Sequence, residues 1–568
     1  LKIIENYEVR KDIEAVYLRS SRKPDLVALD FRAQIAGNTT ARDRILELIK
    51  RYGAATLKGV MKRIIDNSEK SYLDKMSRLP DGEWSDRTYI EACRPGDRRT
   101  HRVMLGLRKE GNKLIFNNDG SAPQEGAMNA TYSGWRGSVM VAVNELLCWD
   151  QYFACGGALR HIEFDPTPGT LNCADFPSSV STAPIQAMEI SLYPAYNVIS
   201  KMIYPDPIMR KDIMCIGGTS QWPATLFRGI DQWGEKYGYL LIDPIGGAIG
   251  AFTMADGINT GGQARTPICQ LPNVEHTEQN FPILFLYRKE LSDSGGAGKY
   301  RGGLSAESCF IPHNTEFVTQ DTLSSGNAIP TSPGLMGGYP STTNAYTFVK
   351  DSNIFDCMAS SQMPKDTDEL LGNSVTLQLR EQNFTQDPKD VYAVRWSGGG
   401  GFGDPFDRAP EDIEDDLESL AITENSAETL YGAILGKDGH VDVERTREHR
   451  AKIRKSRVTE IKKSNRKGQL LSENSHSINI MRDDAGTYWA CAKCDFELGD
   501  ISENYKEHCV TENQSIAVSN PLIGDEARFI DNAVEFRQFY CCQCGCLLDN
   551  EIAIAEDPLL HDSRHQLS

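Results

Sequence analysis

The sequence predicts an α+β fold that combines mixed or antiparallel sheets and several long helices with a small cysteine-rich domain at the C-terminus. Three observations lead to this prediction. Apolar residues recur at helical spacing near the N-terminus, short apolar runs alternate with glycine-rich turns in the middle of the chain, and paired cysteines lie near the C-terminus. Repeated glycine turns suit strands that double back on one another, and they argue against a doubly wound parallel sheet.

The first predicted element is a pair of helices between residues 30 and 67. Apolar side chains recur at helical spacing in residues 45–49 and again in residues 57–65, and Gly53 separates the two runs. Short strands follow a Pro-Asp-Gly turn, and a mostly apolar stretch then predicts a buried helix over residues 132–155. The predicted strands are Tyr89–Ala92, Arg102–Leu107 and Lys113–Asn117.

The clearest local pattern is the segment Leu271–Leu304. Residues 281–287 form an apolar, aromatic run of strand length, and in the loop that follows two cations, Lys299 and Arg301, lie among five glycines. Glycines let backbone or ligand approach closely. The loop is therefore either an anion-facing turn or a tight turn packed against another strand, with its cations in solvent.

Acidic, amide and imidazole side chains lie just ahead of this strand. Glu275 and His276, with Asn273 and Glu278 beside them, form a cluster that could hold a metal ion or move protons. The alternative is a solvated group of hydrogen-bonded surface residues. We retain Glu275 and His276 as catalytic candidates.

Four consecutive glycines occur within the segment Trp396–Pro405. Such a run would suit a phosphate cradle, but the chain contains no G-x-x-x-x-G-K-[ST] signature, and Pro405 ends the run where a P-loop would begin a helix. We interpret the glycines as backbone that passes close to a buried surface. Nucleotide binding is then expected on another chain.

Two C-x-x-C pairs near the C-terminus are the strongest chemical signal in the sequence. Four thiolates complete a tetrahedral shell around zinc, and a two-residue spacer lets each pair bind through one tight turn. Cys509, Cys542, Cys546 and His508 compete for these roles; a redox pair is disfavoured because no βαβ pattern of thioredoxin type lies beside either motif. The predicted ligands of a structural Zn(II) are Cys491, Cys494, Cys541 and Cys544.

The composition is that of a globular protein with an acidic surface. The chain has 568 residues, of which 40% are hydrophobic and 25% charged, and its formal net charge is -18. This length predicts two or more domains. The negative charge would repel a nucleic-acid backbone and an anionic membrane surface, so we expect neither as a partner and favour small molecules and other protein subunits.

Neither a membrane-spanning helix nor a secretory signal is predicted. The most apolar window, residues 237–255, contains Asp243, Pro244 and several glycines, which indicate buried strands and turns. The first ten residues lack a basic start followed by an apolar core. Of the fifteen cysteines, eight are scattered singly and seven lie in the last 80 residues, a pattern typical of reduced thiols and metal ligands. We expect a cytoplasmic protein.

The order of these motifs resembles the hydantoinase B family. The resemblance rests on P-N-V-E-x-x-E at residues 272–278, F-P at 281–282, D-S-G-G-A-G-K-Y-R-G-G at 293–303, and the turns at 333–340 and 396–405. This family includes large subunits of ATP-dependent hydantoinases and oxoprolinases, and of biotin-independent carboxylases that act on acetone or acetophenone. Asp119 and Asn129 lie at matching turns, which makes them substrate-side candidates, with an Asx-turn as the alternative role.

The sequence around the cysteine pairs resembles the gamma subunit of acetone carboxylase, notably at Leu498-Gly499, Asn504–Lys506 and Phe536–Tyr540. This second resemblance favours the carboxylase branch of the family. The family's N-terminal signature N-D-P-x-x-G-G-x-H-x-x-D, which supplies catalytic metal ligands, has no counterpart here. No catalytic metal is therefore assigned to this sequence.

Together the resemblances imply a subunit of a multi-subunit, ATP-dependent, biotin-independent ketone carboxylase that carboxylates a phosphorylated enol with CO2 derived from bicarbonate. A partner related to hydantoinase A would bind ATP and Mg(II), and other carboxylase subunits would complete the complex. The alternatives are a subunit of an ATP-dependent hydantoinase or 5-oxoprolinase, and a non-catalytic scaffold. The expected divisions are a hydantoinase B-like region at 1–445, a basic linker at 446–485 and a zinc-binding, gamma-like domain at 486–568.

Overall fold

The computed structural model describes residues 1–21, 23–151, 154–180, 184–217, 223–267, 269–458 and 466–566. The chain divides into two compact units, Leu1–Ser71 and Tyr72–Ser568. The second unit combines antiparallel and mixed sheets with several helices, which confirms the predicted fold class. No helix in the described ranges has both the length and the apolar character that crossing a bilayer requires.

The first unit is built mainly from helices. A two-stranded ladder of β1 (Ile4–Glu5) and β2 (Glu8–Val9) precedes α1 (Lys11–Arg19), α2 (Pro24–Tyr52) and the start of α3 (Ala54–Met76). Gly53 ends α2 with a φ of 84°, a conformation that glycine adopts without a steric penalty. The predicted helix pair around Gly53 is thus confirmed. Neither α1 nor α2 contains a buried residue.

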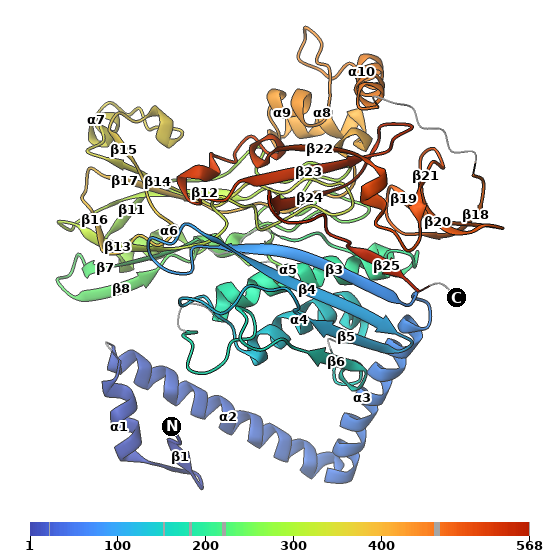
Figure 1. Cartoon of the computed structure of the whole chain (residues 1–568). Coiled ribbons are helices and arrows are strands. Elements are labelled where there is room, and N and C mark those ends of the chain that lie inside the picture. Colours follow the sequence, from blue (N-terminus) through green and yellow to red (C-terminus); the bar gives the residue numbers. More distant parts are fainter. Residues whose placement is uncertain are drawn as a thin grey trace. The chain divides into compact units, whose positions relative to one another are not determined.

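The second unit begins with a sheet whose strand order is β25-β3-β4-β5-β6. All its pairs are antiparallel except β5 with β6. Helices α4 (Tyr132–Leu147) and α5 (Pro184–Ile203) pack against it (Figure 1), and the core between them contains Trp84, Phe116 and Trp135. The strands are β3 (Gly82–Glu91), β4 (Thr100–Glu110), β5 (Lys113–Asn117), β6 (Ile162–Asp165) and β25 (Ser563–His565), so the three predicted strands in this region are confirmed.

Helix α4 is shorter than predicted. It ends at Leu147 rather than near residue 155. The Lys75 ammonium binds the Leu147 carbonyl at 2.7 Å and the Asp150 carboxylate at 2.6 Å. A cation at this position satisfies a terminal carbonyl and complements the negative end of the helix dipole. The predicted helix extended to residue 155, of which residues 152 and 153 lie outside the part of the chain that the structure describes.

Two further sheets form the middle of the second unit. The first has the order β11-β12-β17-β14-β15 and the second β16-β13-β7-β8, and every pair is antiparallel. Phe227, Phe310 and Tyr392 belong to the buried cluster that they share. The strands are β7 (Ala224–Ile230), β8 (Lys236–Leu240), β11 (Ile283–Glu290), β12 (Ala306–Pro312), β13 (Val318–Leu323), β14 (Ala345–Lys350), β15 (Asn373–Thr376), β16 (Phe384–Gln386) and β17 (Val391–Arg395). Shorter elements are β9 (Gly262–Gln263), β10 (Thr266–Pro267), α6 (Val274–Asn280) and α7 (Ile354–Ala359).

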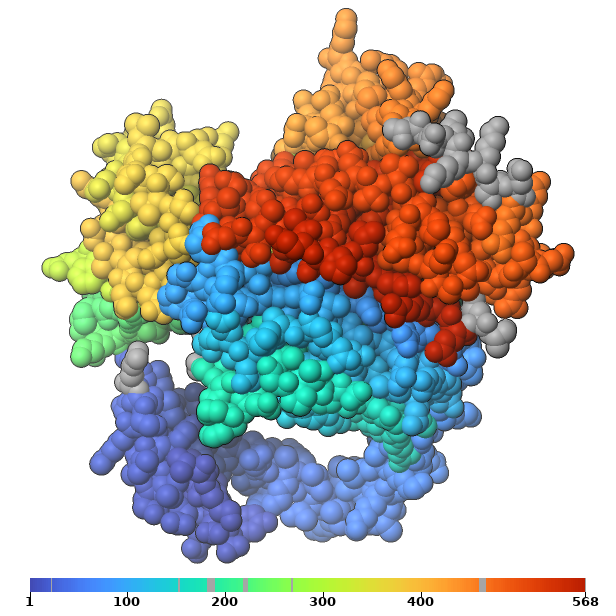
Figure 2. Space-filling model, in the orientation of Figure 1, coloured from blue at the N-terminus to red at the C-terminus, as the bar shows by residue number. Residues whose placement is uncertain are grey.

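The C-terminal part contains two small antiparallel sheets, β18-β19-β20-β21 and β22-β23-β24. In Figure 2 the C-terminal residues lie directly against the segment that contains β3 and β4, and β25 pairs with β3 in the register Ser563 to Trp84. The range 446–485, predicted as a linker, contains most of α10 together with β18 and β19. The bounds are α8 (Pro410–Glu418), α9 (Glu424–Thr429), α10 (Val443–Ser456), β18 (Gln469–Glu473), β19 (Ile478–Asp483), β20 (Gly486–Cys491), β21 (Glu497–Asp500), β22 (Val510–Ser515), β23 (Val534–Tyr540) and β24 (Leu547–Ile554).

The glycine run at 398–401 packs against the glycine-rich loop at 293–303. Gly296 N–H donates to Gly399 O at 2.8 Å, and a Cβ placed on Gly302 would lie 1.8 Å from Gly399 O. Only glycine allows two backbones to approach this closely. The run therefore serves close backbone packing, as we interpreted it from the sequence.

Candidate metal centre and interdomain network

Four cysteines from two distant hairpins converge in the C-terminal part. Cys491 ends β20 and Cys494 follows in the next turn, while Cys541 comes directly after β23 and Cys544 lies in the following turn. All four Sγ atoms lie within 4.8 Å of one another. These are the four residues that the C-x-x-C spacing singled out.

The spacing of the sulfurs fits a tetrahedral metal ion. Zn–S bonds of about 2.3 Å would place the sulfurs of a tetrahedral shell about 3.8 Å apart. The Sγ atoms of Cys491 and Cys544 are 3.7 Å apart, and those of Cys494 and Cys541 are 3.6 Å apart. A disulfide needs about 2.05 Å, and none of the fifteen cysteines forms one. The site thus has the donor set and the dimensions for one thiolate-bound ion.

Each cysteine pair is held by a tight turn. Asp495 N–H donates to Cys491 O and Gly545 N–H donates to Cys541 O, both at 2.9 Å. Gly545 has a φ of 68°, and a Cβ there would lie 1.9 Å from Arg454 O. The sequence therefore needs glycine at 545 both for the turn and for contact with α10.

The thiols share charge unevenly. Hydrogen bonds from Cys491, Cys494 and Cys541 lower the pKa of the Cys544 thiol, whereas hydrogen bonding to Cys491 raises the pKa of Cys494. Several thiolates packed this closely would repel one another unless a cation lay between them. A cation bound among the four sulfurs would allow more than one of them to be deprotonated.

Three of the four competing ligands predicted from the sequence have other contacts. Cys542 Sγ donates to His508 O at 3.1 Å, and Cys509 Sγ donates to Tyr505 O at 3.2 Å. The His508 ring lies 3.0 Å from the Glu503 carboxylate. Cys546 is different: its sulfur lies 3.3 Å from Cys544 and 3.5 Å from Cys491, next to the four-sulfur set.

The cysteine centre is attached to the turn that follows the glycine run. The Asp407 carboxylate pairs with Lys493, which lies between two of the cysteines, and with His476 at 3.1 Å. Burial alone would raise the pKa of Asp407, but hydrogen bonds from His476 and Lys493 hold it well below its usual range. Asp404 also accepts a hydrogen bond from the N–H of Leu547, at 3.4 Å.

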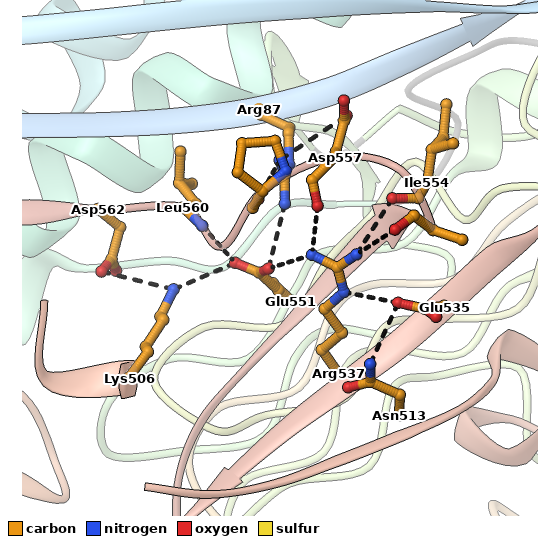
Figure 3. Close-up of polar contacts among 12 residues, drawn as sticks. Arg87, Lys506, Asn513, Glu535, Arg537, Glu551, Ile554, Asp557, Leu560 and Asp562 are labelled. Carbon is orange, nitrogen blue, oxygen red and sulfur yellow. Dashed lines mark hydrogen bonds and ion pairs between the residues drawn. The ribbon is translucent and has the colours of Figure 1, made fainter. Parts of the chain in front are cut away.

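A buried network of charged residues connects β3 and α5 with the C-terminal strands. Figure 3 shows Glu551 between three cations: Arg87 at 3.1 Å, Arg537 at 3.2 Å and Lys506 at 3.4 Å. Lys506 is 1% exposed and also pairs with Asp562, which in turn binds Lys201 of α5. Burial lowers the pKa of Lys506, but the surrounding carboxylates outweigh it and raise the pKa. Arg87 and Glu551 are 464 positions apart in the sequence, and Lys201 and Asp562 are 361 positions apart.

The sequence-derived candidates Asp119 and Asn129 lie in turns that they help to hold. Asp119 is exposed and accepts a hydrogen bond from the Thr167 hydroxyl. Asn129 is buried, accepts from Glu125 N–H at 2.9 Å and donates to Ser179 O at 2.9 Å. Both contacts suit the turn-holding role that the sequence left open as the alternative. Their substrate-side role remains a prediction.

Glu275 and His276 lie in the short helix α6 and are exposed. Asn273 is the N-cap of this helix, and its side chain accepts from His276 N–H at 2.8 Å. Glu278 instead accepts from Phe285 N–H at 2.8 Å. The structure brings the four residues together in one short helix and its cap, and their catalytic role remains a prediction.

Sequence reasoning missed a second cluster beside the end of β3. Atoms of Cys93, Asp97 and His101 lie within 4.8 Å of one another, and the His101 ring contacts Asp97 at 3.0 Å. The spacing C-x-x-x-D-x-x-x-H could have signalled it. Glu91, also missed, is fully buried and accepts N–H groups from residues 326–329.

Comparison with known protein families places the chain in a known class. Residues 1–405 match the Hydantoinase B/oxoprolinase family, and residues 469–568 match the acetone carboxylase gamma subunit family. The first match spans well over half of the chain. The chain belongs to the hydantoinase B/oxoprolinase family, and both predicted resemblances are confirmed.

Individual relatives agree with this assignment. The chain is 23% identical to the acetophenone carboxylase delta subunit of Aromatoleum aromaticum, over 76% of this chain and 64% of that one. It is 30% identical to the acetone carboxylase alpha subunit of Xanthobacter autotrophicus, over 40% and 32% of the two chains. A solved nucleotide-free structure of acetone carboxylase matches with a TM-score of 0.72 and 21% identity, over 81% of this chain and 64% of that one. The chain thus spans less than two thirds of the length of these relatives.

Proposed function

We propose that this chain is a subunit of a multi-subunit ketone carboxylase of the acetone or acetophenone type, ATP-dependent and independent of biotin. The observation that carries the proposal is that a gamma-like segment follows a hydantoinase B region in the same chain. The two are tied together by the β25–β3 pairing and by the buried network around Glu551. A gamma-like segment favours the carboxylase branch of the family over the amidohydrolase branch.

In this proposal the chain encloses the step that forms a carbon–carbon bond. A phosphorylated enol of a small ketone is carboxylated there with CO2 derived from bicarbonate, and excluding water protects the phosphorylated intermediates from hydrolysis. ATP and Mg(II) bind to a partner related to hydantoinase A, and other carboxylase subunits complete the complex. The glycine run at residues 398–401 packs closely against other backbone segments of this chain, which supports the proposal that the nucleotide binds to a partner.

The four-cysteine centre is proposed as a structural zinc site. Cys491, Cys494, Cys541 and Cys544 would hold the ion, because soft thiolate ligands in a tetrahedral shell select Zn(II). Four protein ligands leave no open position, which suits structure rather than catalysis. We place the chain in the cytoplasm, since none of the fifteen cysteines forms a disulfide.

The second candidate is a subunit of an ATP-dependent amidohydrolase. It is favoured by the likeness to a solved structure of the ATP-dependent caprolactamase of Pseudomonas jessenii, with a TM-score of 0.66 and 17% identity, over 79% of this chain and 73% of that one. One chain of a putative D-/L-hydantoinase of a Pseudomonas species is 24% identical, over 76% of this chain and 68% of that one. The gamma-like segment at residues 469–568 does not support this second candidate.

Copurification of the full chain with its partners, followed by mass identification, tests the proposal. The assembled complex is then assayed for ATP hydrolysis with acetone or acetophenone, with and without bicarbonate, and with a cyclic amide. We expect hydrolysis that requires both the ketone and bicarbonate. Hydrolysis driven by the cyclic amide would favour the second candidate. Turnover of ketone by the isolated chain would contradict the division of roles.

A further inference from the structure

Arg380, in the segment between β15 and β16, carries a buried charge that the fold leaves largely unpaired. The residue is 7% exposed, and its Nε donates to the carbonyl of Ala92. Its Nη1 and Nη2 atoms are buried, and neither has a hydrogen-bond partner in the part of the chain that the structure describes. A guanidinium stays charged at any physiological pH, so deprotonation cannot remove its hydrogen-bond donors.

The acidic groups around Arg380 are each engaged elsewhere. Glu91 accepts the N–H groups of residues 326–329, three of them at 3.0 Å. Asp97 binds His101 and Arg99, each at 3.0 Å. Asp321 pairs with Arg228 and accepts from Asn383 N–H. Among the described residues, none forms an ion pair with Arg380.

Buried donors of a cation that lack hydrogen-bond partners are costly for a fold to retain. Such groups are found where a ligand supplies the missing contact. Arg380 contributes to the wall of a cavity of about 400 Å³, which is the size of a small-molecule site. The missing partner is therefore expected to come from a molecule bound in this cavity.

The cavity lining indicates the kind of molecule. Ala127, Leu226 and Leu323 supply an apolar wall, whereas Asp321 contributes negative charge. Cys93 lies on the same wall, and burial raises the pKa of its thiol to about 12, so it is neutral. A divalent cation would be repelled by Arg380. An anion with an apolar remainder suits both the guanidinium and the apolar wall.

We propose that this cavity binds a small organic monocarboxylate, with its carboxylate on Arg380 and its apolar part against Leu226 and Leu323. The planar fork of a guanidinium matches the two oxygens of a carboxylate. Because Nη1 and Nη2 are covered by neighbouring atoms, the ligand reaches them after side chains of the cavity wall move aside, a common adjustment on binding. The proposal does not depend on the metal centre or on the proposed carboxylase reaction.

Calorimetric titration of the purified full chain tests this site. Benzoate and butyrate are the probes, benzamide is the neutral control for benzoate, and inorganic phosphate tests the class of anion. We expect saturable binding of the two carboxylates only. Arg380→Met is expected to weaken benzoate binding by roughly 10- to 100-fold, the loss that follows removal of a charge-assisted pair.

Two further variants keep the test independent of folding defects. Arg380→Lys retains the buried charge but not the fork, and should weaken benzoate binding by roughly tenfold. Arg94→Met removes a cation that is 61% exposed on the same cavity and pairs with Glu125, so it should change binding by less than roughly threefold. Unchanged benzoate affinity in both Arg380 variants, no saturable binding of either carboxylate, or equal binding of phosphate or benzamide would each overturn the proposal.

Discussion

The sulfur of Cys544 lies 3.7 Å from that of Cys491, although 53 residues separate them in sequence. The two turns that carry these cysteines come from different small sheets, β20-β21 and β23-β24. The two sheets meet at these cysteines and at the apolar cluster around Trp489 and Leu548. The first prediction follows from this arrangement.

Cys541→Ser should abolish metal binding. We expect roughly one zinc per chain in the unaltered protein, because four thiolates complete one tetrahedral shell. Elemental analysis by mass spectrometry of the purified proteins measures this. Cys357→Ser, at a cysteine in helix α7 outside the cluster, is the matched control and should retain the metal. Metal content that does not change in Cys541→Ser would reject the ligand assignment.

Glu551→Gln should destabilise the second unit. The substitution removes the charge shared by Arg87, Arg537 and Lys506. Each cation keeps another carboxylate partner, so we expect a loss of about 1–3 kcal/mol, the cost of weakening a buried charged contact. Denaturant unfolding followed by circular dichroism gives the difference. Glu556→Gln alters an exposed glutamate five residues later and should be near neutral. Equal stability of both variants would show that the network contributes little.

His565 should make the protein less stable as the pH falls from 6.5 towards 4. The ring is packed between Trp84 and Trp489, and burial lowers its pKa from 6.5 to about 4. Between these values the unfolded chain takes up a proton that the folded chain does not, so the contribution is complete above pH 6.5 and is lost as the pH falls. The full shift corresponds to about 3 kcal/mol.

The His565 effect is measured as a difference, because other buried groups also titrate. His565→Gln keeps a neutral polar side chain, so the stability of the unaltered protein relative to this variant should decline between pH 7 and pH 4. His313→Gln, at an exposed histidine, is the control. A stability difference that stays constant with pH in His565→Gln would contradict the assignment.

Gly302→Ala should be strongly destabilising. The added Cβ would lie 1.8 Å from Gly399 O, so one of the two glycine-rich segments must move, and overpacking of this kind costs about 1–3 kcal/mol or more. Thermal unfolding measures the loss. Gly238→Ala, in strand β8, places a Cβ in open space and should have a small effect. Similar unfolding temperatures for the two variants would mean that the glycine packing is not tight.

Local patterns in the sequence determined many of the elements and the four cysteines that converge. Helical spacing on either side of Gly53 predicted α2 and α3, alternation and turn residues predicted β3, β4 and β5, and two C-x-x-C pairs named the four cysteines that converge. These features depend on neighbours a few residues away. That is why they can be derived from the chain alone.

Only the tertiary structure decided which distant groups meet. It placed Lys75 at the end of α4, paired β25 with β3, surrounded Glu551 with three cations, and left Nη1 and Nη2 of Arg380 without a hydrogen-bond partner in the described part of the chain. Each of these relationships either joins residues from different elements or depends on what fills the space around a side chain. Spacing along the sequence carries no information about such contacts, because they are fixed by the packing of the whole unit rather than by the geometry of one helix, strand or turn.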